Sequence, residues 1–128
     1  MPSWEEYKAA SKSRGSLAME LFVVESTASA PAEQMQAVLP AHLDYQKQVE
    51  AAGNLFLAGP LSDDTGELMQ GTGMIVYRAA NLDEAKAIAD ADPMHAQNMR
   101  TYKIRKWLVN EGSLQFSIAL SGQKVTMG

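Results

Sequence analysis

The chain of 128 residues contains 46% hydrophobic and 20% charged residues, which fits one globular domain and excludes a disordered tail, a collagen-like fibre or a coiled coil. Its formal net charge of -4 disfavours nucleic acid as a partner, because an acidic surface repels a phosphate backbone. The absence of cysteine excludes disulfides and thiol nucleophiles and fits a reducing compartment. The apolar runs are too short to cross a bilayer and the acidic start is unlike a signal peptide, so we expect a cytoplasmic protein with no membrane partner.

The first predicted element is a short helix. Ser3 and Glu6 have the spacing of a capping box, in which each residue satisfies a free backbone amide of the other. We therefore expect a helix from about Ser3 to Arg14, within an N-terminal arm that spans residues 1–18. The remainder, residues 19–128, is expected to form a single α+β domain.

A strand and a long helix follow the arm. Residues 19–25 have the pattern of a strand with apolar side chains on both faces. Pro31 begins a helical pattern of apolar residues that Gly53 ends. Pro40 has no amide to donate to the carbonyl of Gln36, so the helix is expected either to kink there or to divide into a short turn and a main helix.

The rest of the chain alternates strands with one further helix. Strands are predicted at residues 54–61, 71–78, 102–110 and 114–120, and a helix from Asn81 to Asp92. A turn-rich segment joins the first two of these strands in a hairpin-like connection, and Pro93 is expected to end the helix. The strand at 102–110 has one face that is more polar than the other.

This order of elements predicts an α+β fold with the split βαβ arrangement of ferredoxin-like proteins. Two main helices cover only one face of a four-stranded sheet, yet the strands at 19–25 and 71–78 are apolar on both faces. We therefore expect a second copy of the chain to cover the other face, giving a homodimer or a higher even oligomer of the dimeric α+β barrel type, with a cavity at the seam.

Several short motifs resemble the YCII-related (YciI-like) family over about residues 19–110. They are His42-Leu43, LFLAGPLSD, a glycine before the strand at 71–78, NLDEAKAIADADP, and KIRKW. The resemblance implies a dimeric α+β barrel whose active site uses a histidine on the first core helix and an aspartate before a proline, which fall on His42 and Asp92. The best precedent in the family is dehalogenase or lyase chemistry on small oxygenated rings. This chain differs from the family in having Met94 and then His95 after Asp-Pro, where an aromatic residue is usual.

The positions of His42 and Asp92 allow two interpretations. His42 lies one helical turn from Val38 and Leu39, so it is expected to face inward. It is either a buried histidine bound to a backbone carbonyl or a general base, and Asp92 is either a turn former or the group that fixes the ring of His42. Taken with the family resemblance, a catalytic pair is the favoured hypothesis.

Other residues are candidates for binding. His95, Gly59, Pro60 and Arg105 are predicted to contact a substrate, with Arg105 able to hold an anionic group. A metal set of two histidines and one carboxylate is the less favoured alternative for His95, because no dense ligand spacing is present. We therefore expect no metal and no cofactor.

The leading hypothesis is a homodimeric lyase or isomerase that abstracts a proton from a compact oxygenated molecule. His42 would act as the general base or acid, with Asp92 as its orienting partner. The alternative is a non-catalytic dimer that binds or senses a small molecule in the same cavity. Gly71 and Gly73 lack the third glycine and the helix of a dinucleotide site, and the strand they begin lacks the aromatic and basic residues of an RNA-binding surface.

Overall fold

The computed structural model describes residues 1–128, which divide into two compact units. The larger unit comprises residues 20–107. The smaller unit combines residues 1–19 with residues 108–128. The division of the chain into an arm at 1–18 and a domain at 19–128 stays a prediction. No helix in the structure has both the length and the apolar character needed to cross a membrane.

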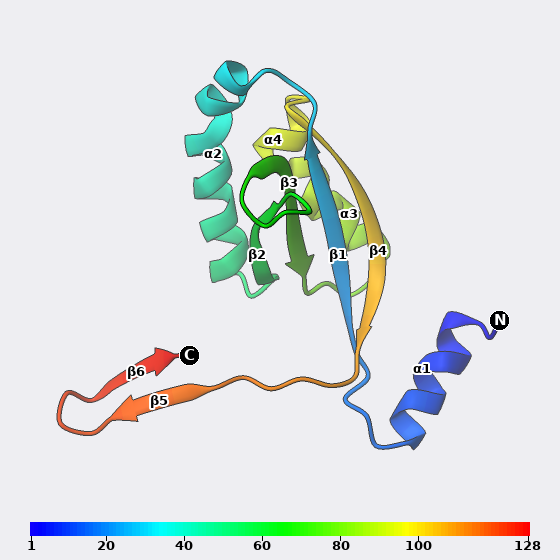
Figure 1. The fold of residues 1–128 in the computed structure, drawn as a ribbon. Helices are drawn as coiled ribbons and strands as arrows, with labels where there is room; N and C mark the ends of the chain where they lie inside the picture. Colours follow the sequence, from blue (N-terminus) through cyan, green and yellow to red (C-terminus); the bar gives the residue numbers. More distant parts are fainter. The chain divides into compact units, whose positions relative to one another are not determined.

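The larger unit contains a four-stranded sheet and three helices (Figure 1). In chain order the elements are β1 (Met19–Ala28), α2 (Ala32–Ala51), β2 (Leu55–Ser62), β3 (Met69–Tyr77), α3 (Leu82–Ala91), α4 (Pro93–Ala96) and β4 (Arg100–Val109). The strand order is β2-β3-β1-β4, and β3 is antiparallel to both of its neighbours. The predicted α+β fold with a ferredoxin-like split βαβ arrangement is confirmed.

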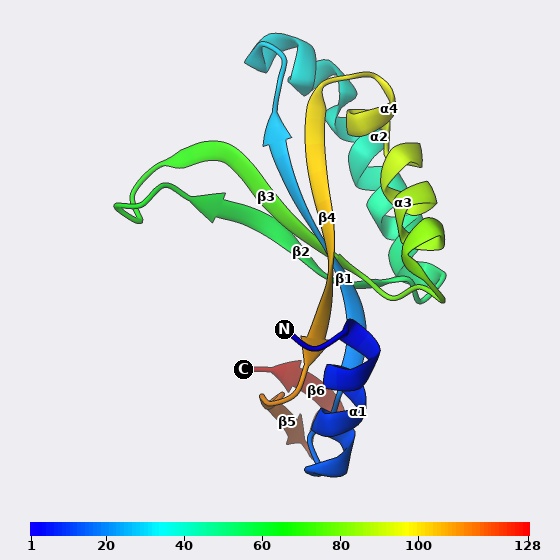
Figure 2. The ribbon, with the colours of Figure 1, turned by 90° about the vertical axis from the view of Figure 1, so that its right-hand side faces the viewer.

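The helices of this unit lie on one face of the sheet (Figure 2). The core between these layers is formed by side chains that alternate along the strands, among them Phe22 and Val24 of β1 and Ile75 and Tyr77 of β3. Alternation places every second residue on the same face of a strand. The helix-facing side is therefore closed by the chain itself, whereas Leu57 and Trp107, on the other side, are 55% and 42% exposed.

The helix boundaries follow from local side-chain contacts, with one unforeseen element. The side chain of Asn81 accepts a hydrogen bond from the amide of Glu84 and begins α3. The helix ends before Pro93, as predicted, but Pro93 also begins the short helix α4, for which Asp92 is the cap. Proline suits the first position of a helix because its φ is already helical and its missing amide would have no partner there.

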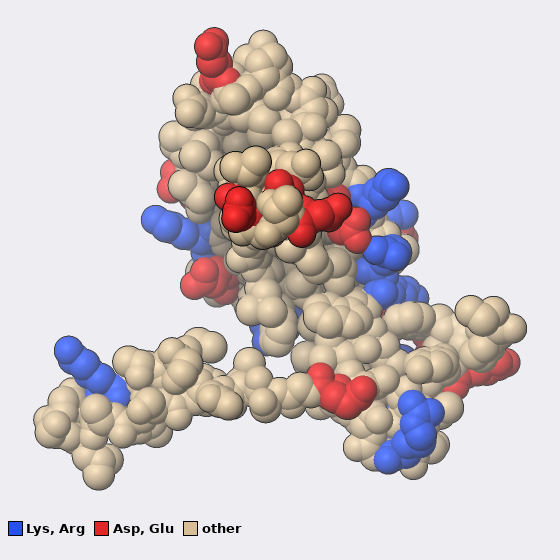
Figure 3. Space-filling model, in the orientation of Figure 1, with Lys and Arg blue, Asp and Glu red and all other residues tan.

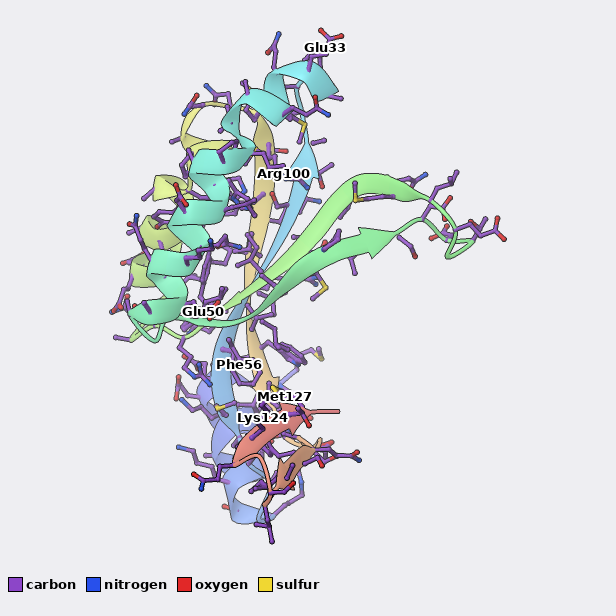
Figure 4. The ribbon with its side chains drawn as sticks, turned by 90° about the vertical axis from the view of Figure 1, so that its left-hand side faces the viewer. Glu33, Glu50, Phe56, Arg100, Lys124 and Met127 are labelled. Carbon is purple, nitrogen blue, oxygen red and sulfur yellow. The ribbon has the colours of Figure 1, made fainter.

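Pro40 lies inside α2 without dividing it. The helix continues from Ala32 to Ala51, and in Figure 4 the turns near Glu33 lie at an angle to those that end near Glu50. A proline removes one helical hydrogen bond and pushes against the preceding turn, which bends a helix. Of the two predicted outcomes at Pro40, the structure has the bent helix.

The smaller unit contains α1 (Trp4–Ser13) and a two-stranded hairpin of β5 (Phe116–Ala119) and β6 (Lys124–Met127). Ser3 and Glu6 form the predicted capping box of α1. The strand predicted at residues 114–120 is present in part as β5, but it pairs only with β6, which the sequence analysis did not predict. All eight residues of the two strands are exposed.

Candidate active site

A cavity of about 510 Å³ lies within the larger unit. Residues from α2, α4 and all four strands of the sheet line it. Most of the lining is apolar, including Met35 and Leu39 of α2 and Met74 and Ile75 of β3. The polar side chains in the wall are therefore few. A pocket of this size, with a few polar groups in an apolar wall, is typical of a small-molecule site.

His42 lies in the wall of this cavity and is paired with Asp92. Nδ1 of His42 lies 2.8 Å from Oδ1 and 2.9 Å from Oδ2 of Asp92. The Asp92 side chain is fully buried and that of His42 is 19% exposed. A carboxylate can only accept, so Nδ1 carries a proton, and in the neutral form of the ring Nε2 is an acceptor. None of the hydrogen bonds that His42 makes in the chain uses Nε2.

Asp92 holds its place because it also caps α4. Its Oδ1 accepts a hydrogen bond from the amide of Met94 at 2.9 Å, and its extended backbone separates α3 from α4. A buried carboxylate needs such partners, since an unpaired buried charge is costly. The same residue therefore ends one helix, begins the next and orients the ring of His42.

Burial changes the acidity of several groups around this pair. Desolvation raises the pKa of Tyr45, and the negative charge of Asp92 raises it further. Burial likewise raises the pKa of Tyr77 far above its ordinary value, again with Asp92 as the next cause. Burial lowers the pKa of Arg100, while the charge of Asp92 acts in the opposite direction. Both tyrosines therefore stay neutral at physiological pH.

The profile of the YCII-related domain matches residues 19–108, which include the His42–Asp92 pair and the four strands except for the last residue of β4. The chain belongs to the YCII-related family. A relative from Bacillus subtilis, the uncharacterized protein YjpA, is 33% identical over 66 residues, which cover 52% of this chain and 71% of YjpA. The predicted family membership is thus confirmed.

A solved structure with the YCII-like fold resembles this chain. It is 5-chloro-2-hydroxyhydroquinone dehydrochlorinase (TftG) from Burkholderia phenoliruptrix AC1100, in complex with 2,5-dihydroxybenzoquinone. The TM-score is 0.55 and the identity is 19%, with 68% of this chain and 92% of the TftG chain covered. At this identity the likeness establishes the fold.

The other predicted binding residues of this YCII-related chain fall in two places. Gly59, Pro60 and His95 line the cavity. Arg105 does not. Its side chain is 76% exposed and forms an ion pair of 2.6 Å with Glu25. Figure 3 shows basic side chains on the side of this unit where β4 lies and acidic side chains over the β2–β3 connection.

Ser26 and Arg100 are among the polar residues of the cavity wall that were not predicted as site residues. The predicted first strand ends at residue 25 and the predicted fourth begins at residue 102, whereas β1 and β4 are longer. Continuing the alternation by two residues would have placed Ser26 beside Phe22 and Val24 on the helix-facing side, and Arg100 in line with Tyr102. A polar residue on an otherwise apolar face was the available signal.

The metal alternative has no support in the geometry. The two histidines and Asp92 do not converge, and no group of three or more His, Asp or Glu residues in the chain could hold a metal ion. Both ring nitrogens of His95 are engaged with protein oxygens, those of Ser26 and Ala89. His95 therefore belongs to a hydrogen-bond network and not to a ligand set with His42.

Proposed function

We propose that this chain is a cofactor-independent lyase or isomerase that uses His42 as its general base or acid. The observation that carries this proposal is the His42–Asp92 pair, with Nδ1 fixed by a buried carboxylate and Nε2 unused at the wall of an apolar cavity. A base oriented by a carboxylate can take a proton from a substrate and return it elsewhere. The named activity of TftG, a dehydrochlorinase, supports elimination as the reaction class.

In the proposed reaction Nε2 of His42 takes a proton from carbon or oxygen of a compact oxygenated ring. The electron pair that remains forms a double bond and expels a leaving group, or shifts the existing double bond. Asp92 stabilises the imidazolium that forms. In an isomerisation the imidazolium then returns its proton to another carbon, and in an elimination it releases the proton to solvent when chloride leaves, or gives it to a leaving group basic enough to accept it. Gly59, Pro60 and His95 would contact the substrate from the cavity wall.

The test is turnover of a panel of chlorinated and unchlorinated hydroxyquinols and hydroxyquinones, followed by chloride release and ultraviolet absorbance. We expect His42→Gln to lower kcat at least about 100-fold on any compound that the wild type converts, because general acid–base catalysis contributes that much or more. Asp44→Asn, an exposed carboxylate change on the same helix, is the matched control and should leave kcat unchanged. Full activity in His42→Gln would disprove the proposal. Compounds that bind without conversion would favour the non-catalytic alternative.

We further propose that two copies of the chain pair through the open face of the sheet. The large apolar side chains of Leu57 and Trp107 are exposed there. Exposed apolar side chains on a sheet face that no helix of the chain covers are typical of an interaction site, and a second copy would cover them.

Light scattering at micromolar concentration tests the pairing. We expect twice the mass of one chain. Leu57→Asp should shift the population toward the single chain, because a charge buried in an apolar interface has no partner. Ala37→Asp, on the exposed side of α2, is the control that should keep the dimer. A wild type that scatters as one chain would disprove the pairing.

A further inference from the structure

A second polar cluster lies in the cavity wall, separate from the His42–Asp92 pair. It joins Ser26 of β1, His95 of α4 and Arg100 of β4. Ser26 Oγ lies 2.8 Å from Nε2 of His95 and accepts a hydrogen bond of 2.8 Å from Nε of Arg100. Figure 4 shows Arg100 at the start of β4. Ser26 thus meets two residues that lie 69 and 74 positions later in the chain.

The direction of each hydrogen bond in this cluster follows from its partners. The carbonyl of Ala89 can only accept, so Nδ1 of His95, at 2.7 Å from it, carries the proton. In the neutral ring Nε2 then accepts the hydroxyl proton of Ser26, whose oxygen accepts from Arg100. His95 therefore orients the Ser26 hydroxyl so that its oxygen accepts from the guanidinium of Arg100.

Arg100 carries a charge that these contacts do not neutralise. One Nη atom donates to the carbonyl oxygens of Ser26 at 2.7 Å and Gly71 at 2.6 Å, and Nε donates to the Ser26 hydroxyl. Each of these acceptors is uncharged, and the other Nη atom makes none of these bonds. Asp92, the negative charge that acts on Arg100 at longer range, is paired with His42. A guanidinium in an apolar wall, fixed by neutral oxygens, is well placed to receive an anion.

We propose that Arg100, held by Ser26 and His95, binds an anionic oxygen of the substrate, either a carboxylate or an ionised enol. This inference rests on the proposed function in taking the cavity as the substrate site, and it adds the chemical class of the substrate. The low polarity of the wall strengthens the attraction between a guanidinium and an anion. The anionic group would then fix the ring while His42 acts on another of its atoms.

Calorimetry with benzoate and the uncharged benzamide, which has almost the same shape, tests the proposal on the intact protein. We expect the wild type to bind benzoate at least about tenfold more tightly than benzamide, because a charge-assisted hydrogen bond distinguishes them. Arg100→Gln should abolish this preference and Arg100→Lys should retain part of it. Arg105→Gln, which removes an exposed arginine of the same strand, is the matched control and should change nothing. The same titrations with 2,5-dihydroxybenzoquinone, an ionised enol near neutral pH, distinguish the two anion types.

The outcomes decide the proposal. Failure of the wild type to bind either anion, or an unchanged preference in Arg100→Gln, would overturn it. If Arg100→Gln does not fold, Ser26→Ala serves instead, because it keeps the guanidinium but removes the one side-chain hydrogen bond that orients it, and it should weaken benzoate binding several-fold without affecting benzamide. His42→Gln should keep the full preference for benzoate. The benzoate preference therefore tests the anion site, and turnover in His42→Gln tests catalysis, so that either proposal can fail without the other.

Discussion

The two histidines of this protein lie in the wall of the same cavity but have opposite hydrogen-bonding arrangements. His42 on α2 donates from Nδ1 to the carboxylate of Asp92, and none of its hydrogen bonds within the chain uses Nε2. His95 on α4 uses both nitrogens, one on the carbonyl of Ala89 and one on the hydroxyl of Ser26. A histidine in a cavity is therefore a candidate base only when one of its nitrogens is left for the substrate.

Asp92 connects the two regions. Its carboxylate fixes the ring of His42 and also accepts from the amide of Met94 in the first turn of α4, the helix that carries His95. A single buried residue thus contacts the proposed general base and caps the helix that carries part of the proposed anion-binding cluster. A change at Asp92 is expected to have the largest effect on the site.

Asp92→Asn should lower turnover at least about 100-fold while keeping the fold. The amide oxygen can still accept from Met94, but the amide nitrogen donates to Nδ1 of His42 and drives the proton to Nε2, which removes the base. Nitrogen-15 spectra of the imidazole check this without any substrate. We expect a protonated Nδ1 in the wild type and a protonated Nε2 in the variant, with the ring of His95 unchanged.

Asp92→Ala tests how much Asp92 contributes to the stability of the fold, apart from its effect on the ring of His42. It leaves the amide of Met94 and the ring of His42 without their acceptor, so the free energy of unfolding should fall by about 1–3 kcal/mol more than in Asp92→Asn. Denaturant unfolding of both variants gives the difference. Identical imidazole spectra in wild type and Asp92→Asn would show that the carboxylate does not select the form of the ring.

The sequence predicts the pairing of His42 with Asp92 but not the second cluster, for a physical reason. A helical apolar stripe and an aspartate before a proline mark the two positions, and the resemblance to the YCII-related family is what singles them out as a pair. Ser26 and Arg100 meet only because β1 and β4 are neighbours in the sheet. The ends of strands depend on pairing partners more than on local preference, so both residues fell just outside the predicted strands.

The same contrast explains the errors in the fold. The capping box of α1 involves residues three apart and is predicted directly. The partner of β5 is not encoded in its own alternation, which is why it was assigned as a strand without β6 being recognised. The short helix α4 was missed because Pro93 was interpreted only as an end, although proline is equally suited to begin a helix.

His95→Ala tests the difference between the two histidines and is expected to have a smaller effect than the changes at Asp92. Removing the ring leaves the carbonyl of Ala89 without its donor and the hydroxyl proton of Ser26 without its acceptor, which should lower the free energy of unfolding by about 1–3 kcal/mol. Because His95 acts through Ser26 and Arg100, we expect KM to rise and kcat to change little. A loss of kcat as large as that of His42→Gln, measured on the same substrate, would contradict the division of roles between the two histidines.

The smallest expected effect concerns Tyr102, whose ring lies 4.8 Å from that of His95 and whose hydroxyl donates to Asp90 at 2.5 Å. Burial, and then the bond to Asp90, raise the pKa of Tyr102 to about 12. Tyrosine in the unfolded chain ionises near pH 10, so the contribution of the Tyr102 hydroxyl to the free energy of unfolding is complete below that pH and is lost as the pH rises toward about 12.

Tyr102→Phe should lower the free energy of unfolding by about 1 kcal/mol or less at neutral pH, because the bond is solvent-exposed. Urea unfolding between pH 9 and 12 checks this, with the two proteins becoming more alike across that window. A difference that grows with pH would reverse the sign and show that the hydroxyl is not held neutral by its surroundings.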